Sequence, residues 1–267
     1  NKSDGTLIYS DKLKLHNIIV FFLSIFLIIF SLIVTGKETE IKMISVSNYV
    51  TGRFDPTKHK NFINLKKTTI PCTSEMYLRR ETVDSLKSLL NDFGKENKKI
   101  RIYIVSATRN FNSQKSIWDN KWTGKKKYPV ASDIVKISDP LQKATKILEY
   151  SSMPGTSRHH WGTDFDINQL NNSYYQKGEG KIIYNWLKKN AAKYGFAQPY
   201  TEGRLNGYKE EKWHWSYMPL SKQFLKDWNS VYNKNPELFT KPGLFKGSDK
   251  SGHLSPIYVN SINPDCK

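Results

Sequence analysis

The chain has 267 residues, with 42 Lys and Arg against 24 Asp and Glu, which gives a formal net charge of +18 at pH 7. This length allows one well-buried domain with appendages. A basic balance suits nucleic acid or an anionic surface, but the lysines are scattered, as at residues 95–99 and 125–127, without stacking residues between them. We therefore expect no nucleic-acid partner. Either an anionic cell-wall polymer or a compositional bias of the source genome explains the charge.

Residues 18–34 form an almost unbroken apolar segment preceded by lysines. Its length lies at the lower edge for a membrane-spanning helix, and it also fits the apolar part of a signal peptide. No clear small-x-small cleavage site follows, so we favour an uncleaved anchor. We take residues 1–17 as an N-terminal flank and residues 18–35 as the anchor or signal segment.

Residues 36–75 are expected to be an extended lead-in, because Gly and Pro interrupt them. Thr82 is expected to cap a helix that ends near Gly94. The apolar residues of this helix share one face, and they are Val83, Leu86, Leu89, Leu90 and Phe93. Residues 100–106 then read as a strand.

A helix and a loop are expected over residues 112–130, and Asp139-Pro140 is a typical helix start. A further helix covers about residues 181–194 and stops at Gly195. Ser221 is expected to cap a helix that carries Phe224, Leu225 and Trp228.

Helices and strands are mixed without regular alternation, which indicates an α+β fold. The expected domain covers residues 76–235, and an irregular tail rich in Pro, Gly and Ser covers residues 236–267. The two cysteines, Cys72 and Cys266, form no Cys-x-x-Cys pair, so a thiolate metal site is not indicated. A disulfide between them would hold the tail to the domain.

Two short segments carry metal-binding residue types. Residues 157–166 read Ser-Arg-His-His-Trp-Gly-Thr-Asp-Phe-Asp, and residues 211–214 read Glu-Lys-Trp-His. His159, Asp166 and His214 are ligand types that Zn²⁺ accepts, and three such ligands leave a fourth position for water.

Glu211 comes shortly before His214, where it is placed to take a proton from that water. Asp164 and Asp166 alternate with apolar residues, which suits a strand with one polar face. A single His is more often structural than a ligand, and we expect His160 to be structural. The combination predicts a hydrolytic zinc site.

These segments resemble the Ser-x-His-x-x-Gly-x-Ala-x-Asp and Glu-x-Trp-His signatures of VanY-type D-alanyl-D-alanine carboxypeptidases. The wider superfamily includes D-Ala-D-Ala dipeptidases, endolysin peptidases and the hedgehog domain. The matching positions are Ser157, His159, Gly162, Asp166, Glu211, Trp213 and His214. Asp164 departs from the signature, which has Ala there. A larger polar group either narrows the site or orients a ligand, and we place Asp164 among the substrate-binding residues.

The resembling enzymes also carry a Ser-x-x-Arg-x-x-x-x-Gln pattern after a strand, which Ser106, Arg109 and Gln114 match. The planar guanidinium of Arg109 can grip a carboxylate or a developing oxyanion with two hydrogen bonds. We expect Arg109 to be catalytic, with a surface salt bridge as the alternative. Gln114 and Ser157 are candidates for holding the substrate, although Ser157 equally suits a turn.

The resemblance covers roughly residues 76–220. It implies a small antiparallel sheet with flanking helices and Zn²⁺ in a cleft on the sheet. It also implies a peptidase that acts on D-Ala-containing peptidoglycan peptides, with D-alanyl-D-alanine carboxypeptidase as the first hypothesis. The alternatives are an endopeptidase of the same fold and a non-catalytic zinc-binding module. A peptidoglycan substrate places the domain in the cell envelope, outside the cytoplasm, either anchored in the inner membrane or secreted if the segment is cleaved.

Overall fold

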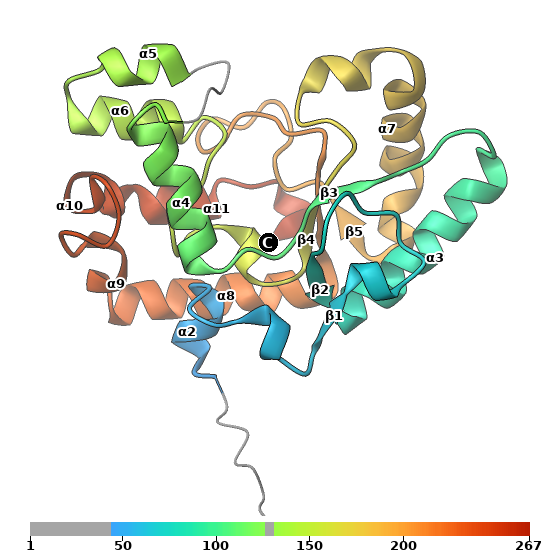
Figure 1. Cartoon of the computed structure of the whole chain (residues 1–267), viewed down its shortest axis with the longest axis horizontal. Helices are drawn as coiled ribbons and strands as arrows, with labels where there is room; N and C mark the ends of the chain where they lie inside the picture. Colours follow the sequence, from blue (N-terminus) through green and yellow to red (C-terminus); the bar gives the residue numbers. More distant parts are fainter. Residues whose placement is uncertain (1–43, 126–130) are drawn as a thin grey trace, which may run out of the picture. The chain divides into compact units, whose positions relative to one another are not determined.

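The computed structural model describes residues 44–125 and 131–267 (Figure 1). The predicted flank and the predicted anchor or signal segment lie outside the described residues. Within the described part of the chain, no helix has both the length and the apolarity needed to cross a membrane. Residues 44–267 form one compact unit.

A four-stranded antiparallel sheet in the order β3-β4-β6-β5 holds the centre of this unit, and a separate two-stranded antiparallel sheet pairs β1 with β2. The strands are β1 Phe62–Asn64, β2 Tyr77–Arg79, β3 Ile104–Ser106, β4 Asp164–Ile167, β5 Phe196–Ala197 and β6 His214–Tyr217. The expected α+β class with small antiparallel sheets and flanking helices is confirmed.

Helices surround the sheets (Figure 1). The α-helices are α2 Val46–Val50, α3 Arg80–Glu96, α4 Phe111–Trp122, α5 Ala131–Lys136, α6 Pro140–Ile147, α7 Gly178–Asn190, α8 Met218–Lys234, α9 Glu237–Thr240, α10 Ser248–Ser251 and α11 Ser255–Asn260. The 3-10 helices are η1 Pro56–Lys58, η2 Leu65–Lys67, η3 Arg158–His160, η4 Asn172–Gln176, η5 Ala191–Tyr194, η6 Gly252–Leu254 and η7 Pro264–Cys266.

The two faces of the central sheet differ in chemistry. Phe165 and Ile167 of β4, with Trp215 of β6, pack into a core together with side chains of α3 and α7. Successive side chains of a strand point to opposite faces. Asp164, Asp166 and their cross-strand partners therefore occupy the other face of the sheet. The expected strand with one polar face is present at β4.

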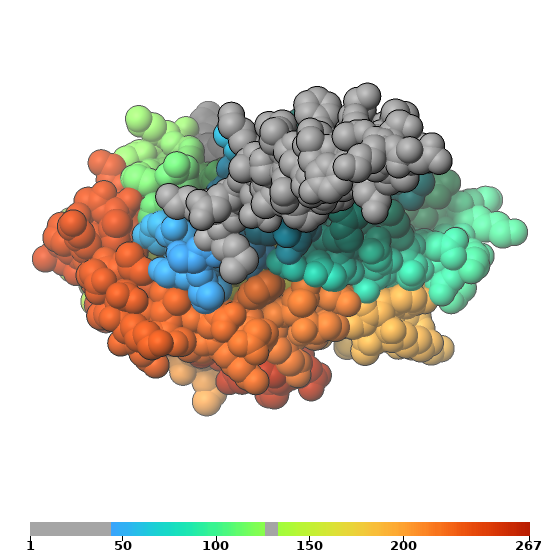
Figure 2. Space-filling model, turned by 90° about the horizontal axis from the view of Figure 1, so that it is seen from below, coloured from blue at the N-terminus to red at the C-terminus, as the bar shows by residue number. Residues whose placement is uncertain are grey.

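A second core lies around α8, and it contains the large aromatic side chains of Trp118, Trp161 and Trp228. The short helix α2 packs against α8, as the blue and orange segments in Figure 2 show. The Tyr49 ring of α2 lies 5.0 Å from the Phe224 ring of α8, and the Tyr49 hydroxyl donates a hydrogen bond to the carbonyl of Trp161, the residue after η3, at 2.7 Å.

Local chemistry set several helix ends as expected. The Asp139 side chain accepts a hydrogen bond from the Gln142 N–H at 2.7 Å and caps α6. Gly195 follows η5 with φ of 78°, the left-handed conformation that suits glycine after a helix.

Other boundaries differ from the sequence prediction. Helix α3 begins at Arg80, directly after β2, so Thr82 is buried inside the helix rather than at its cap. Helix α8 follows β6 in the same way and encloses Ser221. The strand predicted over residues 100–106 is reduced to β3, because only that part pairs with β4.

The described part of the predicted lead-in, residues 44–75, and the predicted tail contain short helices and are not extended or irregular throughout. Val50 and Leu65 from the first segment, and Phe239 and Val259 from the second, are buried in the two cores. Helices of one or two turns are too short to show an apolar period, so the sequence pattern did not reveal them.

Cys72 and Cys266 are both free thiols, so the disulfide that the sequence left open is not formed. Cys72 packs against the core that contains α3, whereas Cys266 is buried in the core around α8. The two thiols therefore serve as small apolar side chains in separate places.

Candidate metal centre and its cavity

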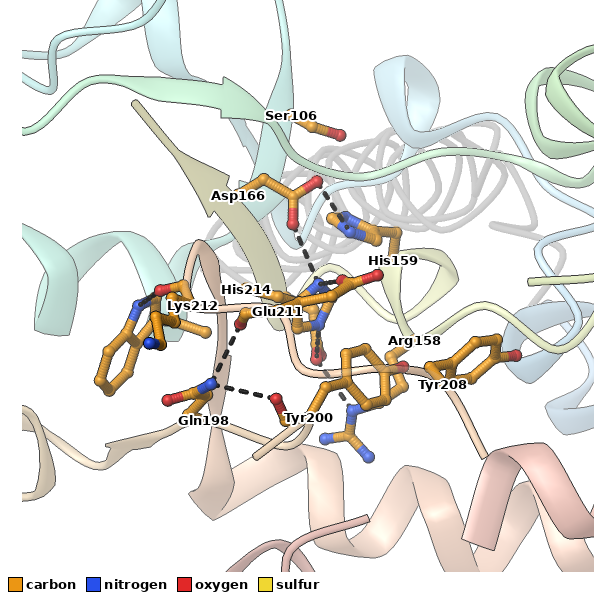
Figure 3. A network of polar contacts seen from close by, with 12 residues as sticks. Ser106, Arg158, His159, Asp166, Gln198, Tyr200, Tyr208, Glu211, Lys212 and His214 are labelled. Carbon is orange, nitrogen blue, oxygen red and sulfur yellow. Dashed lines mark hydrogen bonds and ion pairs between the residues drawn. The ribbon is translucent and has the colours of Figure 1, made fainter. Parts of the chain in front are cut away.

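Three side chains from separate segments converge on the polar face of the central sheet (Figure 3). His159 comes from η3, and Asp166 of β4 lies directly opposite His214 of β6 in the strand register. Their ligand atoms all lie within 4.8 Å of one another, and all three residues are buried. Asp166 Oδ2 is 3.3 Å from His159 Nε2, and Asp166 Oδ1 is 3.0 Å from His214 Nδ1. The structure thus brings together the three ligands that the sequence predicted.

Hydrogen bonds on the outer side of each ring leave one nitrogen facing the centre. His159 Nδ1 lies 2.8 Å from the Ala107 carbonyl, which can only accept, so Nδ1 carries the hydrogen and Nε2 is the candidate ligand atom. His214 Nε2 lies 3.1 Å from Asp164 Oδ1 and donates to it, which leaves His214 Nδ1 as the candidate ligand atom. A carbonyl or carboxylate behind the histidine is the usual arrangement at metal sites. The donor set and these outer partners fit a Zn²⁺ ion.

The surroundings of Asp166 and His159 shift their pKa values in the directions that favour cation binding. Burial alone would raise the pKa of Asp166, but the charges and hydrogen bonds of His159 and His214 outweigh it and hold that pKa well below its usual range. Burial, helped by the nearby Arg109 cation, lowers the pKa of His159 to about 4. At neutral pH an anionic Asp166 and a neutral His159 result, which are the protonation states that metal binding requires.

His214 differs from His159, because it lies between two carboxylates. Burial lowers its pKa, but the hydrogen bonds and charges of Asp164 and Asp166 together outweigh burial and raise it to about 9. A metal ion that binds at Nδ1 has to displace the proton there, so we expect proton release on binding.

Glu211 places a carboxyl group beside this centre without belonging to the ligand set. Its Oε2 lies 3.8 Å from His214 Nδ1, and burial, followed by the charge of Asp166, raises its pKa to about 8. The Gln198 side chain donates to the carbonyls of Tyr200, at 3.0 Å, and Glu211, at 3.2 Å (Figure 3). Gln198 thereby fixes the segment that carries Glu211, a role that sequence reasoning missed.

A cavity of about 580 Å³ opens beside the three candidate ligands and Glu211. Its walls also include the sequence-predicted Arg109 and Gln114. Sequence reasoning missed other residues of the wall, among them Lys121, Tyr150, Ser152, Tyr200 and Tyr208. Aromatic residues in the otherwise polar stretch 196–210 were the available signal, and the Tyr200 ring lies 4.8 Å from the His214 ring.

Arg109 is held in a fixed orientation at this wall. Its Nε donates to Gln114 Oε1 at 2.9 Å, and its Nη1 donates to Ser106 Oγ. Gln114 in turn donates to the Ser152 carbonyl at 2.7 Å, which fixes its own amide. Arg109 Nη1 lies 3.9 Å from Asp166 Oδ2. The Ser-x-x-Arg-x-x-x-x-Gln pattern therefore has a structural meaning, because Ser106 and Gln114 orient the guanidinium beside the centre.

Two predicted substrate-binding residues lie elsewhere. Ser157 and Asp164 are 1% and 0% exposed, and neither is among the residues that line the cavity. Ser157 is the residue before η3, the turn position that was its alternative assignment. The Asp164 carboxylate is enclosed by hydrogen-bond donors from the protein, so the prediction that it contacts substrate requires correction.

His160 is fully buried and both of its ring nitrogens are occupied by the backbone. Its Nδ1 lies 2.6 Å from the Arg109 carbonyl, and its Nε2 accepts the Gly155 N–H at 3.1 Å. Gly52 packs against this ring so closely that a Cβ there would lie 2.4 Å from His160 Nδ1. These contacts agree with a structural His160.

With its α+β fold and a buried His-Asp-His group beside a cavity, the chain has the features of a domain that binds a metal ion at a ligand-binding cavity. The family model for VanY, D-alanyl-D-alanine carboxypeptidase, matches residues 75–220, which is more than half of the chain, and the chain belongs to this family.

One curated relative is similar to this chain at a lower level of sequence identity. YodJ of Bacillus subtilis (strain 168), which carries the name of a carboxypeptidase, is 29% identical over 150 residues. That match covers 53% of this chain and 46% of YodJ, so the chain spans about half the length of this curated relative.

Solved structures are also similar to this chain, at low sequence identity. The LdcB LD-carboxypeptidase is 22% identical, with 68% of this chain and 80% of that chain covered and a TM-score of 0.48. VanYB in complex with D-alanine-D-alanine is 22% identical, with 63% and 86% covered and a TM-score of 0.43. DacB from Streptococcus pneumoniae D39 is 22% identical, with 57% and 72% covered and a TM-score of 0.38.

Proposed function

We propose that the protein is a zinc-dependent carboxypeptidase that removes the terminal D-alanine from peptidoglycan stem peptides, with peptides ending in D-Ala-D-Ala as its first substrate. The observation that carries the proposal is the buried His159, Asp166 and His214 group with Glu211 beside it on the wall of one cavity. Membership of the D-alanyl-D-alanine carboxypeptidase family supports the choice of substrate.

The residues divide the chemistry between them. His159 Nε2, His214 Nδ1 and the Asp166 carboxylate would hold Zn²⁺, which when bound polarises a peptide carbonyl and makes water more acidic. A bound cation would counter the burial that raises the pKa of Glu211, so that the Glu211 carboxylate accepts the proton of the attacking water and passes it to the leaving amine as the peptide bond breaks. The burial of Glu211 keeps this proton transfer away from bulk solvent.

Arg109 supplies a preset cation for the substrate. Because Ser106 and Gln114 fix the guanidinium plane, little side-chain freedom is lost when a carboxylate binds to it. The terminal carboxylate of a stem peptide is the natural partner of such a group, and a carboxypeptidase requires that its substrate have one. A developing oxyanion is the second possible partner of Arg109.

Two alternatives give different products. An endopeptidase would cut inside the stem peptide and would not need the terminal carboxylate. A non-catalytic zinc module would need no base, and the place of Glu211 on the cavity wall argues against it.

The test is incubation of the full chain with defined muropeptides that end in D-Ala-D-Ala or in a single D-Ala, followed by mass analysis. We expect loss of one alanine from the pentapeptide. Cleavage of the tetrapeptide alone would move the proposal to L,D-specificity, and internal fragments would replace it with the endopeptidase. An intact substrate in the presence of bound zinc would contradict all three activities.

We also propose that the domain works outside the cytoplasm, held to the membrane through residues 18–34, because the substrate lies there. Protease added to intact spheroplasts should then digest the domain. Protection from the protease would contradict this location.

A further inference from the structure

A buried ion pair lies directly behind the candidate metal centre. Arg158 and Asp164 are 1% and 0% exposed, and Arg158 Nε donates to Asp164 Oδ1 at 2.9 Å. The pair joins η3 to β4, the two elements that carry His159 and Asp166. Figure 3 shows Arg158 and Asp166 on opposite sides of the His214 ring.

The Asp164 carboxylate has donors on both oxygens. Oδ1 accepts from Arg158 Nε and from His214 Nε2, the latter at 3.1 Å, and Oδ2 accepts from Thr163 Oγ1. The position of Asp164 is therefore fully determined by its neighbours. Since its Oδ1 is the acceptor for His214 Nε2, it sets both the tautomer and the ring plane of His214.

Arg158 is anchored in turn. Its Nη2 donates to Ser216 Oγ at 2.6 Å, and its guanidinium lies 4.7 Å from the centroid of the Trp161 ring. Ser216 is the cross-strand partner of Asp164 and lies two residues after His214 on β6. The cation and the carboxylate thus hold each other on the same pair of strands that presents Asp166 and His214.

We propose that Asp164, neutralised by Arg158, is a positioning residue that holds His214 Nδ1 toward the metal. The inference rests on the proposed function, since it assumes that His214 is a ligand. It gives the departure from the family signature a physical role, because the Ala of that signature offers no acceptor for His214 Nε2.

A purely stabilising role explains the pair less well. Two charges that leave water pay a desolvation cost that their attraction often fails to recover, and an apolar pair of similar volume is frequently as stable or more stable. Arg158 is needed because a carboxylate this deeply buried requires a countercharge. What an apolar pair cannot supply is the hydrogen-bond acceptor behind His214.

The test compares Asn and Leu at position 164, two side chains of nearly the same shape. Both are introduced together with Arg158→Met, so that no unpaired charge remains. In Arg158→Met/Asp164→Asn the amide oxygen can still accept from His214 Nε2, whereas in Arg158→Met/Asp164→Leu nothing can. The readout is the zinc dissociation constant of the metal-free full chain, measured by competition with a chelator. We expect the Leu variant to bind zinc about 10- to 100-fold more weakly than the wild type, the usual effect of losing an outer partner of a ligand, and the Asn variant to recover most of the affinity.

Ser216→Ala is the matched control, because it removes a hydrogen bond from Arg158 and leaves Asp164 with His214. Its zinc affinity should equal that of the wild type. If the Leu variant does not fold by circular dichroism, Arg158→Met/Asp164→Ala takes its place with the same expectation.

Equal zinc affinity in the wild type and in the folded variant without an acceptor would overturn the inference and leave the proposed function standing. An equal loss in Ser216→Ala would also overturn it, since general loosening would then explain the effect. A wild-type chain that binds no zinc would overturn both.

Discussion

Two neighbouring cross-strand pairs on one face of the central sheet have opposite surroundings. Asp166 and His214 face each other beside the cavity, whereas Asp164 and Ser216, the next pair on that face, are sealed beneath Arg158. The same residue type therefore occurs at both positions of β4 with different consequences. Asp166 keeps its oxygens toward two histidines and a cavity, while every oxygen of Asp164 is already used by the protein. The difference makes Asp166 the candidate metal ligand and not Asp164, although both are aspartates of the same strand.

The largest effect on zinc affinity is expected from removal of the Asp166 carboxylate, the one beside the cavity. Asp166→Ala removes an oxygen ligand, so zinc affinity should fall by more than the roughly 10- to 100-fold that losing an outer partner costs. Chelator competition on the metal-free chain measures this affinity, and peptide cleavage should be lost with it. Arg158→Met/Asp164→Asn, which changes the sealed pair, is the control and should still bind zinc. Stoichiometric zinc in Asp166→Ala would exclude Asp166 as a ligand.

Glu211 lies on the cavity side but outside the ligand set, so its loss should separate rate from metal content. Glu211→Gln keeps the shape of the side chain and removes its ability to take a proton. We expect a fall in kcat of about 10²- to 10⁴-fold with zinc affinity retained. Metal analysis and steady-state kinetics on the same sample provide the measurement. Loss of zinc from this variant would make Glu211 a ligand instead of a base.

Arg109 also lies on the cavity wall, where we expect it to contact substrate rather than metal. Arg109→Lys keeps the charge and loses the planar fork, and a hydrogen bond to a charged group is worth about 1.5–3 kcal/mol, so kcat/KM should fall roughly 10- to 100-fold. Amidation of the terminal carboxylate of the substrate should lower the wild-type kcat/KM by a similar factor and affect the variant less. Equal cleavage of free and amidated peptides by the wild type would remove the carboxylate role of Arg109 and favour the endopeptidase.

The smallest effect on metal binding is expected at His160, on the sealed side. His160→Ala leaves the Gly155 N–H and the Arg109 carbonyl without their partner, so the free energy of unfolding should fall by about 2–5 kcal/mol while zinc affinity stays unchanged. Urea unfolding of the metal-free chain measures the first quantity. His159→Ala should show the reverse pattern, and a loss of zinc in His160→Ala matching that in His159→Ala would contradict the division between the neighbouring histidines.

The free energy of unfolding of the wild type and of His160→Ala should also differ in its dependence on pH. Burial lowers the pKa of His160 from 6.5 to about 3, so the unfolded chain binds a proton that the folded chain does not over this interval. The contribution of His160 to stability is thus complete above pH 6.5 and declines as pH falls toward 3. The wild-type free energy of unfolding should decline more steeply in this range than that of His160→Ala. Identical slopes would contradict a neutral, buried His160.

Sequence reasoning succeeded where the determining chemistry is local. Asp139 before Pro140 and Gly195 after η5 end their helices through contacts within a few residues. The metal group was also predictable, because its residues fall in two compact segments of recognisable spacing. Thr82 and Ser221 were placed wrongly because a preceding strand runs directly into each helix, so neither helix needs them as a cap.

The role of Asp164 was not available from sequence, because it depends on three segments meeting. Arg158 comes from η3 and His214 from β6, and only the folded strand register places both against the Asp164 carboxylate. The same reason applies to Gln198, whose effect on Glu211 is exerted through backbone carbonyls.

We propose that one zinc ion held by His159, Asp166 and His214 makes this chain a peptidase. The most direct measurement is a zinc titration of the metal-free chain in which cleavage of a peptide ending in D-Ala-D-Ala is followed at each addition. We expect no cleavage at the start and a linear rise that levels at one zinc per chain. Full cleavage by the verified metal-free chain, or no cleavage at saturating zinc, would contradict it.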